Sequence, residues 1–106
     1  MKKVIYIASP YTKGDNFVNV QKSIEAANKL LDMGYIALSP LVNSVFYNMQ
    51  KERSWQEWMD IDYQLVNMCD CLVRLPGEST GADAEVVYAL SHNKPVYIGM
   101  EQVPSV

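Results

Sequence analysis

The chain has 106 residues, of which 49% are hydrophobic and 20% are charged, and its formal net charge is -3. This length predicts one domain, 1–106, and this apolar content predicts a packed core rather than a disordered chain. There are 9 basic and 12 acidic residues, and no basic cluster. We therefore expect no binding to polymeric DNA or RNA, or to an anionic membrane.

Cys69 and Cys71 are the only thiols, and their spacing matches neither a CxxC redox pair nor a disulfide framework. This predicts a reduced, cytoplasmic setting. Because His92 is the only histidine, no ligand set has zinc spacing, and we expect no metal. The apolar run in MKKVIYIASP is too short for a signal peptide, and no segment reaches the roughly 20 apolar residues of a membrane span.

The first half of the chain predicts a β-α-β unit. The run KVIYIA at 3–8 is β-branched and aromatic and ends at Ser9, which indicates a buried strand. A polar loop at 11–15 leads into a helix over 16–33 that ends before Gly34. The expected core face of this helix comprises Val20, Ile24, Ala27 and Leu31. The run YIALS at 35–39 then predicts a second, parallel strand.

The second half continues the alternation. Residues 41–54 are interpreted as a further helix. A clearer helical pattern covers 55–69, where Ser54 is a good N-cap and Glu57 completes a capping box. The run CLVRL at 71–75 predicts a third strand. The turn-rich PGESTG then leads to a helix over 81–92, and PVYIG forms the last strand.

Strands that alternate with helices predict an α/β fold, a flavodoxin- or Rossmann-like three-layer sandwich with a parallel sheet of four to five strands. In such sheets, ligands bind beyond the carboxyl ends of the strands. The segments SPYT, SPL and PGEST follow the first three strands. We therefore expect these segments to form the site, with Ser9 and Pro10 in the first of them.

Asp62 lies in the middle of an apolar stripe on the helix at 55–69. The stripe also contains Trp55, Trp58, Met59, Leu65, Val66 and Cys69. A carboxylate among apolar side chains costs several kcal/mol unless it is paired, protonated or open to a site. Asp62 is therefore either a paired core acid or a functional carboxylate. We expect the two tryptophans to fill the core or a subunit interface.

The segment GESTGADAE places Ser79 and Gly81 at a strand-to-helix turn, where free N–H groups and the helix dipole favour an anion such as phosphate. The alternative for Ser79 is simple helix capping. Neither GxxxxGK[ST] nor GxGxxG is present. Glu85 lies at the edge of the apolar face of this helix and leans toward the sheet edge. Tyr6 needs a polar partner for its hydroxyl, and Glu85 is the candidate.

Three motifs in order, YIASPYT, Asp62 eight residues before the acid of MCD, and STGADAE, resemble the nucleoside 2-deoxyribosyltransferase superfamily. The superfamily includes deoxynucleoside 5′-monophosphate N-glycosidases, and the likeness spans about residues 4–98. It implies a retaining attack on the anomeric carbon of a nucleotide or nucleoside, and a glycosyl-enzyme that water or a second base resolves. By this resemblance Glu85 is the nucleophile, Asp62 assists the leaving base, and Tyr6 positions the nucleophile.

The transferases of that superfamily have an aspartate six residues before the glutamate, where this chain has Ser79. A serine can donate to a phosphate and removes a repelling charge, so with Gly81 it favours a 5′-monophosphate. The resemblance also implies a base pocket shaped by the segment from Asn43 to Arg53, no cofactor, and a homodimer or larger assembly. The alternatives are a nucleotide-binding or nucleotide-sequestering protein without turnover, and an interaction protein on the same scaffold.

Overall fold

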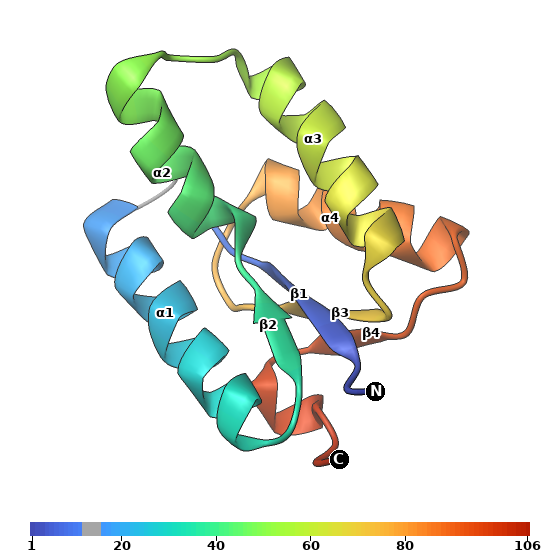
Figure 1. Cartoon of the computed structure of the whole chain (residues 1–106). Coiled ribbons are helices and arrows are strands. Elements are labelled where there is room, and N and C mark those ends of the chain that lie inside the picture. The colour runs from blue at the N-terminus through green and yellow to red at the C-terminus, as the bar shows by residue number, and fades with distance from the viewer. Residues whose placement is uncertain (12–15) are drawn as a thin grey trace.

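In the computed structural model of the chain, which describes residues 1–11 and 16–106, four strands form one parallel sheet (Figure 1). The strands are β1 (Val4–Ala8), β2 (Ile36–Leu38), β3 (Cys71–Arg74) and β4 (Val96–Ile98), in the spatial order β2-β1-β3-β4. Strand β1 is central, and its Tyr6 lies opposite Leu38 of β2 and Leu72 of β3. The predicted α/β fold is confirmed, with four strands in the described residues.

The helices are α1 (Asn16–Asp32), α2 (Pro40–Gln50), α3 (Trp55–Met68) and α4 (Thr80–Ser91), and a 3-10 turn η1 (Met100–Gln102) follows β4. The helix interpreted near 41–54 is confirmed over Pro40–Gln50, whereas residues 51–54 form the connection to α3. Pro40 suits the start of this helix, where no N–H bond is needed. The side chain of Ser54 accepts from the backbone N–H of Glu57 at 3.1 Å, as its capping role predicts. The sequence pattern did not predict η1. The predicted loop 11–15 lies, from residue 12 on, outside the described residues.

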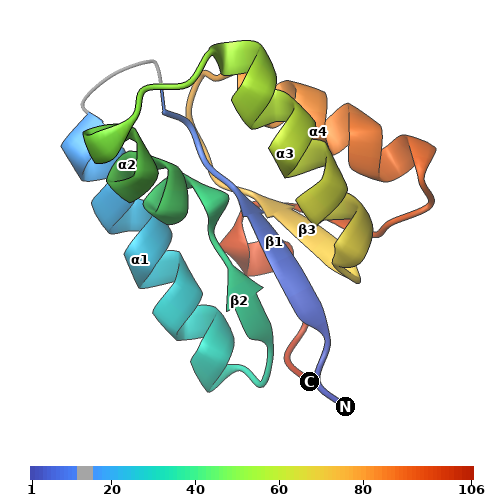
Figure 2. The same cartoon turned by 45° about the horizontal axis from the view of Figure 1, so that its top comes forward.

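Helix α1 covers one face of the sheet, and α3 and α4 cover the other (Figures 1 and 2). The alternation of β1 sends Ile5 and Ile7 toward α1, whereas Tyr6 and Ala8 point toward α3 and α4. Because both faces are covered, the strands are apolar almost throughout, as is usual for a parallel sheet. No helix in the described part of the chain is long and apolar enough to cross a membrane.

The buried face of α1 differs from the predicted one. Ser23, Ala26 and Leu30 are buried, whereas Ile24 and Leu31 are about half exposed. Ser23 can be buried because its hydroxyl lies 2.5 Å from that of Ser39, which directly follows β2. With this partner a serine can occupy a buried position. Hydrophobic periodicity alone assigns a serine to the solvent side of a helix. The predicted buried face was therefore rotated relative to the observed one.

The residues after β4 complete the core on the α1 face. Val103 is buried in that cluster, and the hydroxyl of Tyr35 donates to the carbonyl of Pro104 at 2.6 Å. The N–H of Val106 donates to the carbonyl of Met33 at 3.3 Å. This face of the sheet is therefore closed by apolar packing and by the residues that follow β4.

Candidate active site

A cavity of about 400 Å³ opens on the α3 and α4 side, beyond the carboxyl end of β1. Its walls come from the end of β1, from α2 and the loop after it, from α3, and from the first half of α4. The predicted site residues that line it are Tyr6, Ser9, Asp62, Ser79, Gly81 and Glu85. The cavity thus lies at the sheet edge that the strand order predicted.

The hydroxyl of Tyr6 donates to Oε2 of Glu85 at 2.8 Å, and both residues are buried. Tyr6 stands in the middle of β1, and Glu85 stands in the second turn of α4. The two elements are held together by the apolar cluster that includes Ala82 and Ala89 of α4. The predicted partnership of Tyr6 and Glu85 is therefore confirmed as a contact.

The carboxyls of Glu85 and Asp62 form an electrostatically coupled pair. Burial is the largest cause that raises the pKa of Glu85, to about 9, and the Asp62 carboxyl adds to it. Burial also raises the pKa of Asp62. Because a second negative charge in one buried site is costly, ionisation of both carboxyls at once is disfavoured. Burial and Glu85 raise the pKa of Tyr6 well above its usual value, so its hydroxyl remains a donor.

Two serine hydroxyls beside this pair have unused hydrogen-bonding capacity. Ser79 caps α4, because its Oγ accepts from the N–H of Ala82 at 3.1 Å, and the capping alternative is confirmed. A hydroxyl that accepts still has its own proton to donate. Ser9 Oγ is buried and has no hydrogen-bond partner among the described residues. A buried, unpaired hydroxyl costs about 1–3 kcal/mol, so it indicates a contact that a bound molecule would complete.

Trp55 and Trp58 line the cavity and do not belong to the buried core, so of the two expected places, the core and a subunit interface, the core is excluded. Trp58 Nε1 donates to Oδ1 of Asn48 at 3.2 Å, and its ring stacks on Tyr47 with centroids 6.5 Å apart. A helical wheel identifies the inward face of α3, but not that its first turns pass over a cavity. Flat aromatic walls of this kind suit a ring-shaped ligand.

Pro10 and Asn43, both predicted to bind substrate, do not line the cavity. The chain leaves the strand after Ala8, and the ring of Pro10 lies so close to Gly77 that a Cβ on that glycine would come within 2.8 Å of it. Asn43 is exposed on α2. Ser44 and Asn48 are the polar residues of that helix that face the cavity, one turn apart, and Asn43 projects about 100° away from Ser44.

The starts of three helices surround the cavity. Pro40 begins α2, Trp55 begins α3, and Gly81 is the second residue of α4, and all three line the wall. Helix N-termini carry partial positive charge, which favours an anionic ligand and offsets the carboxyl pair. Arg53 also lines the cavity and pairs with Glu57 at 3.3 Å. Among the residues that the structure describes, no cluster of three His, Cys, Asp or Glu side chains could hold a metal.

Comparisons with known proteins agree with this architecture. The family described as a domain of unknown function, DUF4406, matches residues 3–98. A solved structure of a 2-deoxyribosyltransferase from the psychrotolerant bacterium Bacillus psychrosaccharolyticus has a TM-score of 0.63 at 22% identity. The similarity covers 95% of this chain and 77% of that one, and it establishes a shared fold. No curated protein matches the sequence significantly.

Proposed function

The chain belongs to the DUF4406 family, and we propose that it is an enzyme that cleaves or exchanges the N-glycosidic bond of a (deoxy)nucleoside 5′-monophosphate or deoxynucleoside. One observation carries the proposal. The buried Glu85 accepts from Tyr6 at 2.8 Å, and its pKa is raised to about 9 by burial and by Asp62, beside an aromatic-walled cavity of about 400 Å³. The fold shared with a 2-deoxyribosyltransferase supports the same conclusion.

In the first step Glu85 attacks C1′ of the sugar. Tyr6 occupies Oε2, which leaves Oε1 as the attacking oxygen. A C1′–O bond forms while the C1′–N bond breaks, and the electron pair of that bond passes to the base nitrogen. Asp62 supplies the proton that the departing base takes up, which lowers the cost of the oxocarbenium-like transition state. Before this step the proton lies on Asp62 and the negative charge lies on Glu85.

In the second step Asp62, now ionised, accepts a proton from water or from the N–H of a second base. The deprotonated acceptor attacks C1′, the bond to Glu85 breaks, and the configuration of the starting nucleotide is restored. Asp62 again holds the proton, so the pair leaves the cycle with the same proton count. This requirement explains why one proton, rather than none or two, suits the resting site.

The substrate we favour is a 5′-monophosphate. Ser79 and Ser9 offer donors, and the start of α4 adds backbone N–H groups and a favourable dipole. Trp55 and Trp58 provide aromatic surface on which a base can stack. A cavity of about 400 Å³ lies in the size range of small-molecule sites.

The direct test is to incubate the protein with a panel of deoxynucleosides and their 5′-monophosphates, with and without an acceptor base, and to measure released base by chromatography. We expect release from a 5′-monophosphate, and loss of release in Glu85→Ala. Ser79→Asp should lower kcat/KM for the monophosphate at least about tenfold, because it adds a negative charge next to the phosphate, and should spare the nucleoside.

Two outcomes would redirect the proposal. If nucleosides are better substrates than monophosphates in the wild type, the phosphate preference is wrong. If no substrate releases base while both wild type and Glu85→Ala bind nucleotide, the protein sequesters nucleotides rather than cleaving them. Thermal shifts on addition of each nucleotide measure that binding independently of turnover.

A further inference from the structure

Arg74 is a buried charge that the proposed reaction does not use. It is the last residue of β3 and is only 9% exposed. Arginine is rarely buried unless each part of its guanidinium finds a partner. The partners of this guanidinium therefore show what the charge does there.

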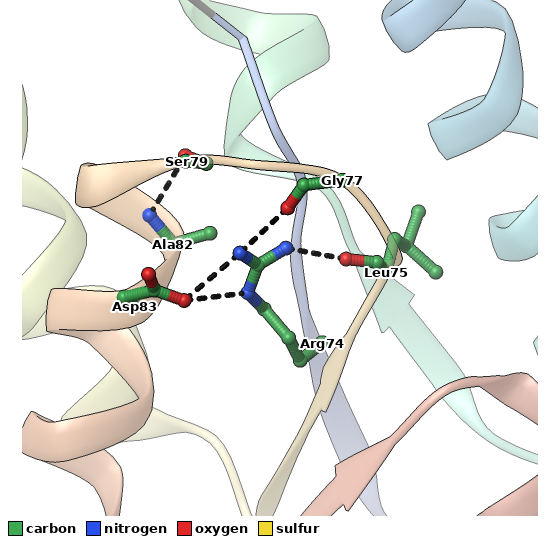
Figure 3. Close-up of polar contacts among 6 residues, drawn as sticks. All are labelled: Arg74, Leu75, Gly77, Ser79, Ala82 and Asp83. Carbon is green, nitrogen blue, oxygen red and sulfur yellow. Dashed lines mark hydrogen bonds and ion pairs between the residues drawn. The ribbon is translucent and has the colours of Figure 1, made fainter. Parts of the chain in front are cut away.

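The guanidinium binds both the turn that follows β3 and the first turn of α4 (Figure 3). Nη1 donates to the carbonyl of Leu75, and Nη2 donates to the carbonyl of Gly77 at 2.8 Å. Nη2 also donates to Oδ1 of Asp83 at 2.9 Å, and Nε reaches the same oxygen at 3.3 Å. One planar group therefore links β3, the turn and α4, and the fixed fork of arginine is suited to this task.

The turn also lies against Pro10. Gly77 has φ +126°, and a side-chain carbon there would come within 2.8 Å of the Pro10 ring. Pro10 itself is buried. The turn therefore contacts both the Arg74 guanidinium and the Pro10 ring, and a glycine is required where the turn approaches Pro10.

We propose that Arg74 is a positioning residue that fixes the start of α4, and with it Ser79 and Glu85, relative to Tyr6. Asp83 precedes Glu85 by two residues, so the two side chains leave α4 about 200° apart. Arg74 therefore holds the helix from the side away from the cavity. The role in catalysis rests on the proposed function, whereas the role in fixing the turn does not.

Its charge has a second effect. Arg74 opposes the rise in the pKa of Glu85 that burial and Asp62 cause. Removal of the charge should therefore raise that pKa further. In the proposed reaction, kcat/KM falls when the carboxyl pair loses its last proton, so the alkaline limb of the pH profile reports this pKa.

The test compares Arg74→Met and Arg74→Lys with Lys22→Met, which removes an exposed cation from α1. We expect kcat to fall about 10- to 100-fold in both Arg74 variants, because a misplaced nucleophile is costly, while KM changes less than about threefold. The alkaline limb should move to higher pH in Arg74→Met and stay in place in Arg74→Lys, which keeps the charge. Lys22→Met should match the wild type in all of these.

Amide hydrogen exchange tests the turn without any turnover. In Arg74→Met we expect the N–H groups of Ala82 and Asp83 to exchange at least about tenfold faster, because both bond to Ser79. The N–H of Trp58, bonded to Ser54 in α3, should keep its rate. Equal acceleration at all three amides would overturn the proposal and leave a general stabilising role.

The outcomes separate the two proposals. If a folded Arg74→Met keeps wild-type kcat, pH profile and exchange rates while Glu85→Ala is inactive, the positioning role is wrong and the proposed function stands. If the wild type releases no base from any substrate, the proposed function fails, and the exchange rates still decide whether Arg74 fixes the turn. If Arg74→Met does not fold, Arg74→Lys supports the same comparison, since it keeps the charge but loses the fork.

Discussion

The two faces of the sheet differ although one strand, β1, supplies residues to both. Toward α1 it sends Ile5 and Ile7 into an apolar cluster that the residues after β4 close. Toward α3 and α4 it sends Tyr6, whose hydroxyl meets a buried glutamate beside an open cavity. The first face is closed by apolar packing, whereas the second buries polar groups at a cost to stability, which the proposed reaction would explain.

The largest expected difference comes from Glu85→Gln, which tests the cavity side. The substitution keeps the shape of the side chain and removes the nucleophilic oxygen. We expect kcat/KM for the best substrate to fall at least about 10³-fold, since the covalent step is lost. Measured base release settles the point, and activity within tenfold of the wild type would exclude Glu85 as nucleophile.

Leu30→Ala tests the α1 side. Leu30 is fully buried in the apolar cluster, so its truncation should destabilise the protein by about 2–5 kcal/mol. We expect kcat/KM to stay within about twofold at temperatures where the variant remains folded. Denaturant unfolding and steady-state kinetics measure the two quantities, and a large kinetic loss in the folded variant would show that the faces are not independent.

Two buried tyrosines offer a matched comparison, because each face has one. Tyr6→Phe removes the donor to Glu85 and should lower kcat about 10- to 100-fold, the effect of one hydrogen bond to a charged group. Tyr35→Phe removes the bond to the Pro104 carbonyl and should cost about 1 kcal/mol of stability without a kinetic effect. Equal losses of kcat in the two variants would show that the two faces of the sheet do not differ in this respect.

A further expected effect is a gain in stability for Glu85→Gln. The pKa of Glu85 is raised from 4.5 to about 9 in the folded state, so the folded protein holds a proton that the unfolded chain releases between these values. Stability therefore falls as pH rises through that window, and glutamine has no such loss. We expect Glu85→Gln to be more stable by about 1–3 kcal/mol at pH 8, and by much less at pH 5. Unfolding curves at both pH values test the sign.

Features of the fold that depend on local sequence pattern could be predicted. The strands, the helices and the edge where Tyr6 and Glu85 meet follow from hydrophobic period, caps and the rules of parallel sheets. The face of α1 could not be predicted, because the buried Ser23 contacts Ser39, which lies outside the helix, and the pattern of the helix does not show this contact. The placement of Trp58 over a cavity depends on how α2 and α3 diverge, which no single helix encodes.

The sequence around Arg74 contains an indication of its buried role. An arginine inside the apolar run CLVRL must find several oxygens when its strand is buried. Nearby groups in the sequence include the carbonyls of the PGEST turn and the acids Asp70, Glu78 and Asp83. That Arg74 donates to the Gly77 carbonyl and to Asp83 depends on the path of that turn, which the sequence pattern does not give.

The proposed covalent bond between Glu85 and the sugar can be trapped and weighed. The protein is incubated with a 2′-fluoro analogue of its best 5′-monophosphate, because the fluorine slows release of the glycosyl-enzyme. The intact mass of the protein is then measured. We expect the mass of the protein to increase by that of the fluorinated sugar phosphate. Peptide analysis should map this adduct to Glu85, and Glu85→Gln should not form it. Base release without any adduct, or an adduct on another residue, would contradict it.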